Sequence, residues 1–345
     1  MLFLATKEIL ERARFTQAFA PLMTEETMKK LLYLSLPLVM MVLLASCIKD
    51  NIEGCERDIV FEYYADGDTD VFPKHITSVN LYVFDSEDRL LEKHCRRLEQ
   101  NDLKAHQGVK LSLNPGEYRF VCLGNDYDLT EVYNIECGDM SGITYRHPDC
   151  FDTPCQGNDS LYLGSKRVVI PEDAWYFREK VRLYSSHHKV SYTVKGYYGE
   201  EPTRAGSYLD LRVKNLKPQS SFDQAHEMNL GYGEEVDYAP EFEWNSENGD
   251  HTAYFHIMRH SANNNVEFEL VDRATGTVLH TLKLKDFLEQ YKEYVDVTKQ
   301  EVLIPIVVEF KTIGITVKIA DWVVNDVTPG FGNDNGNEPD DENNI

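Results

Sequence analysis

The segment Ser186-His187-His188-Lys189 holds residues that could carry catalysis. Ser186 and Lys189 have the S-x-x-K spacing of serine acyl-enzymes, where one turn of helix sets the lysine beside the serine hydroxyl. Here the segment enters a predicted strand, in which residues three apart point to opposite faces. Adjacent strand residues also face apart, so His187 and His188 are not expected to share a metal ion. We predict from this pattern that the chain is not an enzyme.

Cys150 and Cys155 flank Phe-Asp-Thr-Pro, a turn-like stretch, and are the pair that we expect first to form a disulfide. With His147 they also give the pattern H-x2-C-x4-C, which supplies three zinc ligands. Structural zinc sites hold four ligands, and no fourth stands nearby, so no metal site is predicted. The alternative is that the cysteines stay reduced as free thiols, which we expect if the habitat is anaerobic.

Asp66, Asp68 and Asp70 place carboxylates at alternate positions, a spacing that suits a hard cation such as calcium. An EF-hand loop that starts at Asp66 needs glycine where Val71 stands and glutamate where Thr77 stands. We therefore expect a solvated loop here. No phosphate-binding glycine motif opens a helix elsewhere, so the sequence predicts no cofactor.

The N-terminal region has the features of an export signal. Met28-Lys29-Lys30 precedes an uncharged run over residues 31–48, which ends in small residues. A positive start, a short apolar run and small residues before the cut are typical of a secretory signal peptide. An uncut membrane helix is the alternative, but the run is short for a bilayer and Pro37 interrupts it. We interpret residues 1–46 as a signal peptide, with 1–27 as an extension before the true start.

Leu44-Ala45-Ser46-Cys47 resembles a bacterial lipobox. The resemblance implies cleavage between Ser46 and Cys47 and acylation of the Cys47 thiol, which would hold the mature chain in the outer membrane. Residues 47–56 are then a lipid tether. Six cysteines remain after Cys47, an even number that leaves many pairings open.

The charge balance limits the partners. Lys and Arg total 35 and Asp and Glu total 58, which gives a formal net charge of −23. A protein that coats nucleic acid needs a basic face, so no nucleic-acid partner is expected. Hydrophobic residues make up 42% of the chain, which excludes a disordered protein as a whole. Residues 326–345 are acidic and too polar to form a core, and we predict a disordered tail there.

From residue 59 onward the apolar residues recur with the period of two that indicates strands. Ser78–Asp85 alternates clearly, and Asn114-Pro115-Gly116 predicts a hairpin turn before the next strand. A second block of strands begins near residue 180, and residues 286–294 give the one convincing helix. Residues 124–160 look irregular. The sequence therefore predicts an all-β fold with two domains, at residues 57–170 and 171–325.

The order of these motifs resembles the FimB/Mfa-type fimbrial anchor lipoproteins of Bacteroidetes. The resemblance rests on the following segments: Cys47 with Cys55, Val60-Phe61-Glu62-Tyr63, Phe72-Pro73 leading into Ile76–Asp85, Asn114-Pro115-Gly116 with Tyr118 and Leu123-Gly124-Asn125, and the strand that ends at Trp322. It implies two tandem transthyretin-like β-sandwich domains after a lipoprotein signal peptide. It also implies an outer-membrane anchor or accessory subunit of a surface fimbria, joined to fimbrial subunit proteins by β-strand exchange.

The tail after Val324 lacks alternating apolar residues and would be a poor donor strand. If this chain donates a strand, we expect Val302–Val308 or Gly314–Val324 to supply it; otherwise the chain acts as an acceptor. The alternative function is a surface lipoprotein that binds glycan or host protein through exposed aromatics, with Phe61–Tyr64 and Trp175-Tyr176-Phe177 as candidates. The position at the base or tip of the fibre and the partner subunit stay open.

Overall fold

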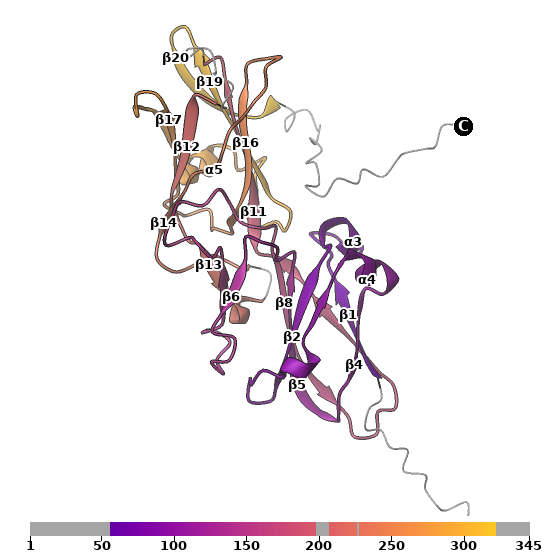
Figure 1. Cartoon of the computed structure of the whole chain (residues 1–345). Helices are drawn as coiled ribbons and strands as arrows, with labels where there is room; N and C mark the ends of the chain where they lie inside the picture. The colour runs from indigo at the N-terminus through magenta and orange to yellow at the C-terminus, as the bar shows by residue number, and fades with distance from the viewer. Residues whose placement is uncertain (1–55, 198–206, 226–227, 322–345) are drawn as a thin grey trace, which may run out of the picture. The chain divides into compact units, whose positions relative to one another are not determined.

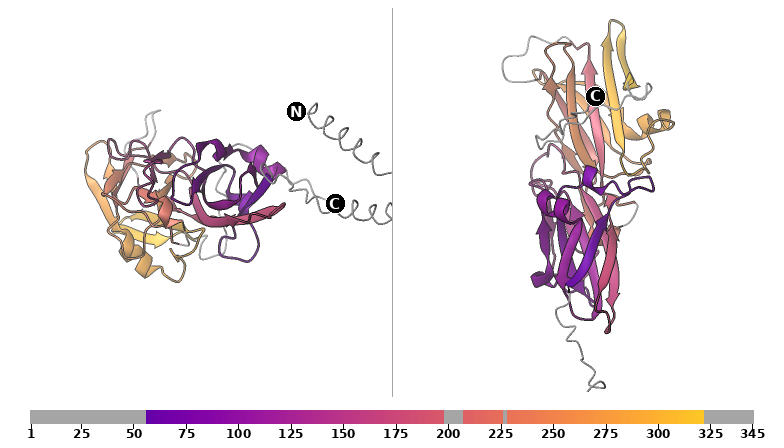
Figure 2. Two further views of the ribbon diagram at one scale, coloured as in Figure 1. Left: turned by 90° about the horizontal axis from the view of Figure 1, so that it is seen from below. Right: turned by 90° about the vertical axis from the view of Figure 1, so that its right-hand side faces the viewer.

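A computed structural model describes residues 56–197, 207–225 and 228–321 of the 345-residue chain. Strands dominate these residues, and Figure 2 shows that strands and loops make up nearly all of the coloured ribbon. The α-helices in the described part are short: α3 (Phe72–His75), α4 (Gln100–Ala105) and α5 (Leu284–Gln290). None of the described helices has the length and apolar character needed to cross a membrane. The predicted all-β class is confirmed.

The first half of the described chain forms a sandwich of two sheets (Figure 1). One sheet has the order β4-β1-β9 and the other β10-β8-β5-β2-β3. The strands are β1 (Glu56–Glu62), β2 (Val79–Asp85), β3 (Arg96–Leu98), β4 (Gly108–Ser112), β5 (Gly116–Gly124), β8 (Tyr162–Ile170), β9 (Phe177–Arg182) and β10 (Tyr184–Ser185). Alternate apolar residues of both sheets, such as Phe61 and Val83, are fully buried between them. Their burial is the main favourable contribution to this fold.

The second half forms a second sandwich, with sheet orders β15-β16-β11-β19-β20 and β14-β12-β17-β18. The strands are β11 (His187–Lys195), β12 (Leu209–Leu216), β14 (Val236–Tyr238), β15 (Glu243–Trp244), β16 (His251–Met258), β17 (Glu267–Asp272), β18 (Val278–Lys283), β19 (Leu303–Lys311) and β20 (Gly314–Ile319). Helix α5 adds Phe287 and Leu288 to the core of this sandwich. The two sheets thus enclose a core of their own.

A small third sheet lies outside the first sandwich. It consists of β6 (Glu131–Tyr133), β7 (Thr144–Arg146) and β13 (Gln219–Ser221), in the order β13-β7-β6. Phe222 follows β13, and its ring packs against Tyr82, Phe84 and Tyr145. Residues 124–160, predicted to be irregular, therefore contain two strands, which are only three residues long and give no periodic signal.

The strand pairing corrects two further expectations. Asn114-Pro115-Gly116 does not make a hairpin, because β4 pairs with β1 in one sheet and β5 pairs with β2 and β8 in the other. Gly116 has a φ of +152°, which favours glycine at the point where the chain crosses between sheets. The predicted boundary between residues 170 and 171 does not follow the pairing either. β9 pairs with β1 and β10 with β8, so both belong to the first sandwich.

All three described α-helices differ from the prediction, and α3 was not expected at all. Helix α5 begins at Leu284 and ends at Gln290, earlier at both ends than the expected 286–294. Helix α4 was missed in the sequence. Its N-terminus carries a capping box in which Glu99 and Asp102 each accept a hydrogen bond from the other's backbone N–H. The usual signature has serine or threonine at the first of these positions, so the pattern was hard to recognise.

Candidate functional site

The residues of the predicted export and lipidation site lie outside the described part of the chain. Ser46 and Cys47, expected to flank the cleavage point, precede residue 56, where the description begins. Cys55 precedes it as well. Cleavage at Ser46–Cys47 and acylation of Cys47 thus stay predictions.

Cys150 and Cys155 are both free thiols in the structure and both lie in the core of the second sandwich. They are 3% and 4% exposed. Burial raises the pKa of both thiols, and that of Cys155 rises to about 12, with the nearby Cys150 thiol as a further cause. His147 accepts a hydrogen bond from the backbone N–H of Asp149 through Nδ1, at 3.1 Å. Disulfide formation between the two cysteines stays a prediction.

Ser186 and Lys189 do not meet. The Ser186 hydroxyl accepts hydrogen bonds from the Tyr145 hydroxyl at 3.0 Å and from the Asn229 side chain at 3.2 Å. The Lys189 ammonium instead donates to Glu301 at 2.6 Å. The two side chains of the S-x-x-K pattern therefore serve different contacts.

The aspartates at 66–70 serve the backbone. Asp70 Oδ1 accepts from the N–H groups of Tyr63 at 3.1 Å and Phe72 at 3.0 Å. Asp66 Oδ2 accepts from the N–H of Gln300 at 2.9 Å. In the ranges that the structure describes, no three histidine, cysteine or acidic side chains gather closely enough to hold a metal ion.

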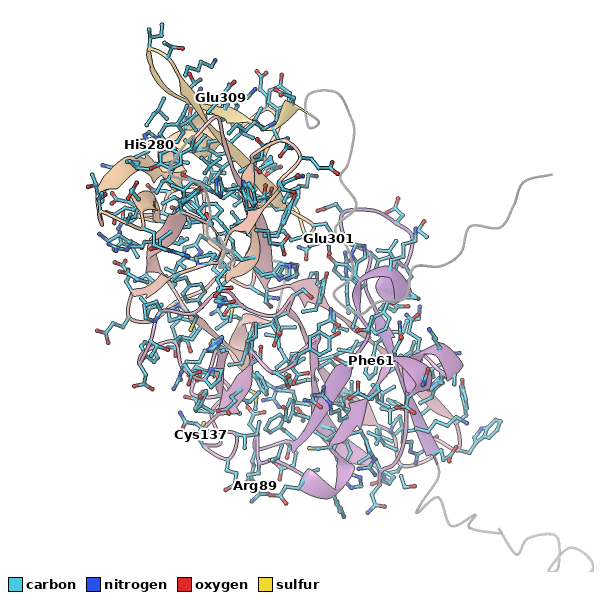
Figure 3. All side chains as sticks on the ribbon, turned by 45° about the horizontal axis from the view of Figure 1, so that its top comes forward. Phe61, Arg89, Cys137, His280, Glu301 and Glu309 are labelled. Atoms are coloured by element: carbon cyan, nitrogen blue, oxygen red, sulfur yellow. The ribbon has the colours of Figure 1, made fainter. Side chains whose placement is uncertain are left out.

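Sequence analysis missed a partly buried polar group, which we call the Glu301 cluster: Tyr63, His75, Tyr162, Lys189 and Glu301. The hydroxyls of Tyr63 and Tyr162 donate to Glu301 Oε1 at 2.6 and 2.8 Å. His75 Nδ1 lies 3.3 Å from the same oxygen, and Lys189 Nζ lies 2.6 Å from Oε2. Glu301 lies two residues before Leu303, where β19 begins (Figure 3).

The electrostatics keep Glu301 ionised. Burial alone would raise its pKa, but Lys189, His187 and His75 outweigh burial and lower the pKa to about 2. Burial and the Glu301 charge raise the pKa of both tyrosines, so both hydroxyls stay protonated and donate. Hydrogen bonds to an ionised acceptor are stronger than those between neutral groups. The cluster is therefore a carboxylate that accepts hydrogen bonds from three donors, Tyr63, Tyr162 and Lys189, with the His75 ring beside it.

The cluster joins the two sandwiches. Tyr63, His75 and Tyr162 come from the first sandwich, whereas Lys189 and Glu301 come from the second. Arg259, fully buried, reinforces the same segment and donates to the carbonyls of Val297 and Lys299 at 2.8 Å each. These contacts link side chains of the two sandwiches. No spacing in the sequence announces it, because Tyr63 and Glu301 are 238 positions apart.

Strand β20 lies at one edge of its sheet in the second sandwich. It pairs with β19 on one side, and the Tyr291 hydroxyl donates to the Val317 carbonyl at 3.3 Å on the other. Residues of an antiparallel strand point their backbone groups alternately to either side, so Ile315 also directs its N–H away from β19. Ile315 is 37% exposed and the preceding Ile313 is 97% exposed. This edge is therefore apolar at its tip.

The aromatic residues proposed for glycan binding divide into two groups. Phe61 and Tyr63 are fully buried in the first sandwich, so these members of the Phe61–Tyr64 candidate were wrong. Trp175 and Tyr176 are 81% and 60% exposed, and their ring centroids lie 6.4 Å apart. They lie in the loop between β8 and β9 and are the most exposed members of the predicted set, whereas Tyr64 and Phe177 are half-buried.

Comparison with known proteins relates the chain to fimbrial proteins. A family model described as fimbrillin-A associated anchor proteins Mfa1 and Mfa2 matches residues 53–328. The comparison with curated proteins finds no match. The matched range includes both sandwiches.

Several solved structures share the fold at low sequence identity. A candidate adhesin from Bacteroides ovatus aligns with a TM-score of 0.61 and 17% identity, over 80% of this chain and 96% of that one. A candidate polysaccharide-binding protein from Bacteroides thetaiotaomicron gives 0.59 and 15%, over 76% and 96%. The fimbrial anchor protein Mfa2 from Porphyromonas gingivalis gives 0.54 and 15%, over 76% and 95%. At these identities the likeness is one of fold.

Proposed function

Because the chain belongs to the family of fimbrillin-A associated anchor proteins, we propose that it is an anchor or accessory subunit of a surface fimbria. The family is one of structural proteins at the cell surface. Lipid on Cys47 holds the chain in the outer membrane, and β-strand addition joins it to other fimbrial subunits. The family match over residues 53–328 is the observation that carries this proposal.

The strand topology favours β20 as the strand that joins a neighbour. Of the two segments expected as donors, Val302–Val308 overlaps β19, which is paired on both sides, with β11 and β20. Its removal would open the core, where Ile304 and Ile306 are fully buried. The segment from Gly314 contains β20, an edge strand with backbone groups directed outward. In this proposal β20 accepts a strand from a neighbouring subunit, which would gain main-chain hydrogen bonds there and side-chain contacts at alternate positions.

The Glu301 cluster also suits a fibre subunit. A subunit at the base of a fibre transmits force between its anchored end and its joined end. The charge-assisted contacts of Glu301 with Tyr63, Tyr162 and Lys189 tie the first sandwich to the second between those ends. Their role in this account is mechanical, and we propose no catalytic role for them.

The decisive experiment for lipid anchoring compares Cys47→Ala with Cys137→Ala, in which an exposed thiol elsewhere is removed. Mass spectrometry measures acylation and fractionation measures retention in the outer membrane. We expect Cys47→Ala to release the protein and its fibres into the medium, because no acyl chain then remains to hold it. Retention of the unacylated variant in the membrane would refute the anchor.

A disulfide between Cys150 and Cys155 belongs to this proposal as well. Alkylation of the exported protein under denaturing conditions, before and after reduction, counts the thiols. We expect two more alkylated cysteines after reduction, both in the peptide that spans residues 150–155. Full alkylation of that peptide without reduction would show that the thiols stay free.

A further inference from the structure

We propose that Trp175 and Tyr176 form a membrane-contact loop that rests on the bilayer to which Cys47 is attached. The inference rests on the proposed lipid attachment and adds a second contact with the same membrane. It concerns the loop of residues 171–176, between β8 and β9. Trp175 is 81% exposed and Tyr176 60%, while Val169, just before the loop, is 66% exposed. Large apolar side chains gathered at one place on a surface indicate an interaction site.

The loop is held firmly in place. Arg57, which is fully buried, donates through Nη1 to the Ala174 carbonyl at 2.6 Å and through Nε to the Leu113 carbonyl at 3.2 Å. The backbone N–H of Ala174 donates to the Pro171 carbonyl at 3.3 Å. A buried guanidinium thus fixes the residue before Trp175. The exposure of the two rings is therefore built into the loop.

The topology sets this loop beside the start of β1. β1 and β9 run parallel, and Arg57 is paired with Phe177, the residue that follows Tyr176. The aromatic pair therefore lies at the end of the first sandwich where the chain arrives from Cys47. Glu56 is the ninth residue after Cys47. Even a fully extended chain of that length reaches only about 30 Å, so acylation of Cys47 would keep this end of the sandwich near the bilayer.

The chemistry of the pair fits a lipid surface. Tryptophan and tyrosine are enriched where headgroups meet acyl chains, because each ring combines an apolar body with a polar atom. A weak contact becomes effective when a tether raises its local concentration. A glycan could also stack on these rings, but the neighbouring attachment point favours the membrane. The function gained is orientation, since a second contact limits how the base of the fibre tilts.

The test uses the chain from residue 47 onward with a histidine tag in place of the lipid, captured on phosphatidylcholine vesicles that contain a nickel-chelating lipid. The chain has three tryptophans, Trp175, Trp244 and Trp322. Trp244→Phe with Trp322→Phe leaves Trp175 as the reporter. Trp175→Phe with Trp322→Phe leaves Trp244, 42% exposed in β15, as the matched control.

We expect vesicles with brominated acyl chains to quench Trp175 and to shift its emission to shorter wavelength, while Trp244 keeps its emission. Equal emission of Trp175 on brominated and ordinary vesicles would overturn the inference. Quenching of both tryptophans alike would overturn it too, because the contact would not belong to the loop. A response of Trp175 to soluble glycans without quenching by bromolipid would make the loop a glycan site instead.

A failure of the proposed function can be distinguished from a failure of this inference. Mass spectrometry of the protein from cells reports whether Cys47 is acylated, whereas the tagged chain on vesicles reports only on the loop. Trp175→Ala with Tyr176→Ala in the tagged chain gives a second readout. We expect this variant to tilt more freely on supported bilayers in polarised fluorescence. Unchanged orientation would contradict the inference.

Discussion

Strands β9 and β20 both lie at sheet edges, yet their side chains differ in kind. β9, at the edge of the first sandwich, has the sequence Phe-Arg-Glu-Lys-Val-Arg. Arg178 pairs with Asp58 at 3.3 Å, and Lys180 pairs with Glu62. β20, at the edge of the second, carries one charge, Lys318, and follows the exposed Ile313. Charged side chains oppose the addition of another strand, whereas an apolar edge permits it. The difference indicates that the molecule closes one edge and leaves the other open.

The largest expected effect concerns the Glu301 cluster, which links the two sandwiches that carry β9 and β20. Glu301→Gln removes the partly buried anion of the Glu301 cluster and leaves Lys189 without its partner. Loss of one member of a buried ion pair costs several kcal/mol, and we expect about 3 kcal/mol in the free energy of unfolding. Urea unfolding at pH 7 measures it. Glu309→Gln, which changes a half-exposed residue of β19, is the control (Figure 3).

The same variant has a defined pH dependence. The folded-state pKa of Glu301 is about 2, below its ordinary value of 4.5. A lowered pKa means that the stabilisation is complete above pH 4.5 and is lost as the pH falls from 4.5 towards 2. We expect the unfolding free energy of Glu301→Gln to vary less than that of the unaltered chain across this window. If the unfolding free energy of both proteins had the same pH dependence, the Glu301 carboxylate would not stabilise the contact between the sandwiches.

The next effect concerns the open edge. Ile315→Pro removes an N–H that faces away from β19, so it blocks strand addition while it spares the β19 ladder. Ile315→Ala loses the same apolar side chain but keeps the N–H. We expect the proline variant to lose most fibre attachment in whole-cell counts, and the alanine variant to keep most of it. Equal loss in both would assign the joining to the side chain rather than to strand addition.

The smallest effect concerns the closed edge. Arg178→Thr with Lys180→Thr removes two cations from β9 and inserts β-branched residues that suit a strand. We expect weak self-association, measured by sedimentation equilibrium. Lys285→Thr with Lys292→Thr makes the same change in charge outside any strand, in and just after helix α5, and should leave the monomer unchanged. A strictly monomeric β9 variant would mean that charge is not what closes this edge.

The sequence predicted what local patterns encode. The alternation over Ser78–Asp85 marks β2 because one face of that strand is buried. Asn114-Pro115-Gly116 marks a bend between two strands and not the predicted hairpin turn, because a local sequence cannot tell which sheet the next strand joins. The boundary at residue 170 failed for a related reason. β9 completes the sheet of β1, which lies about 120 positions earlier, and no local signal records that pairing.

The site was harder to predict than the fold. Tyr63 belongs to a strand motif that could be recognised, but its hydroxyl meets Glu301 only after both sandwiches have formed. The exposure of a side chain could not be predicted either. Phe61 and Trp175 are both aromatic, and only their places in the fold put one in the core and the other on the surface. The charged pattern of β9 and the apolar pattern of β20 could be read directly. Only the order of strands in each sheet shows that both strands lie at edges.

The most direct test of the account is photo-crosslinking in cells with a benzoylphenylalanine residue at position 313, beside β20, or at position 178, in β9. We predict that the probe at 313 captures a fimbrial subunit and that the probe at 178 captures none. Capture at 178, or at both positions alike, would contradict the claim that β20 is the edge through which this chain joins the fibre.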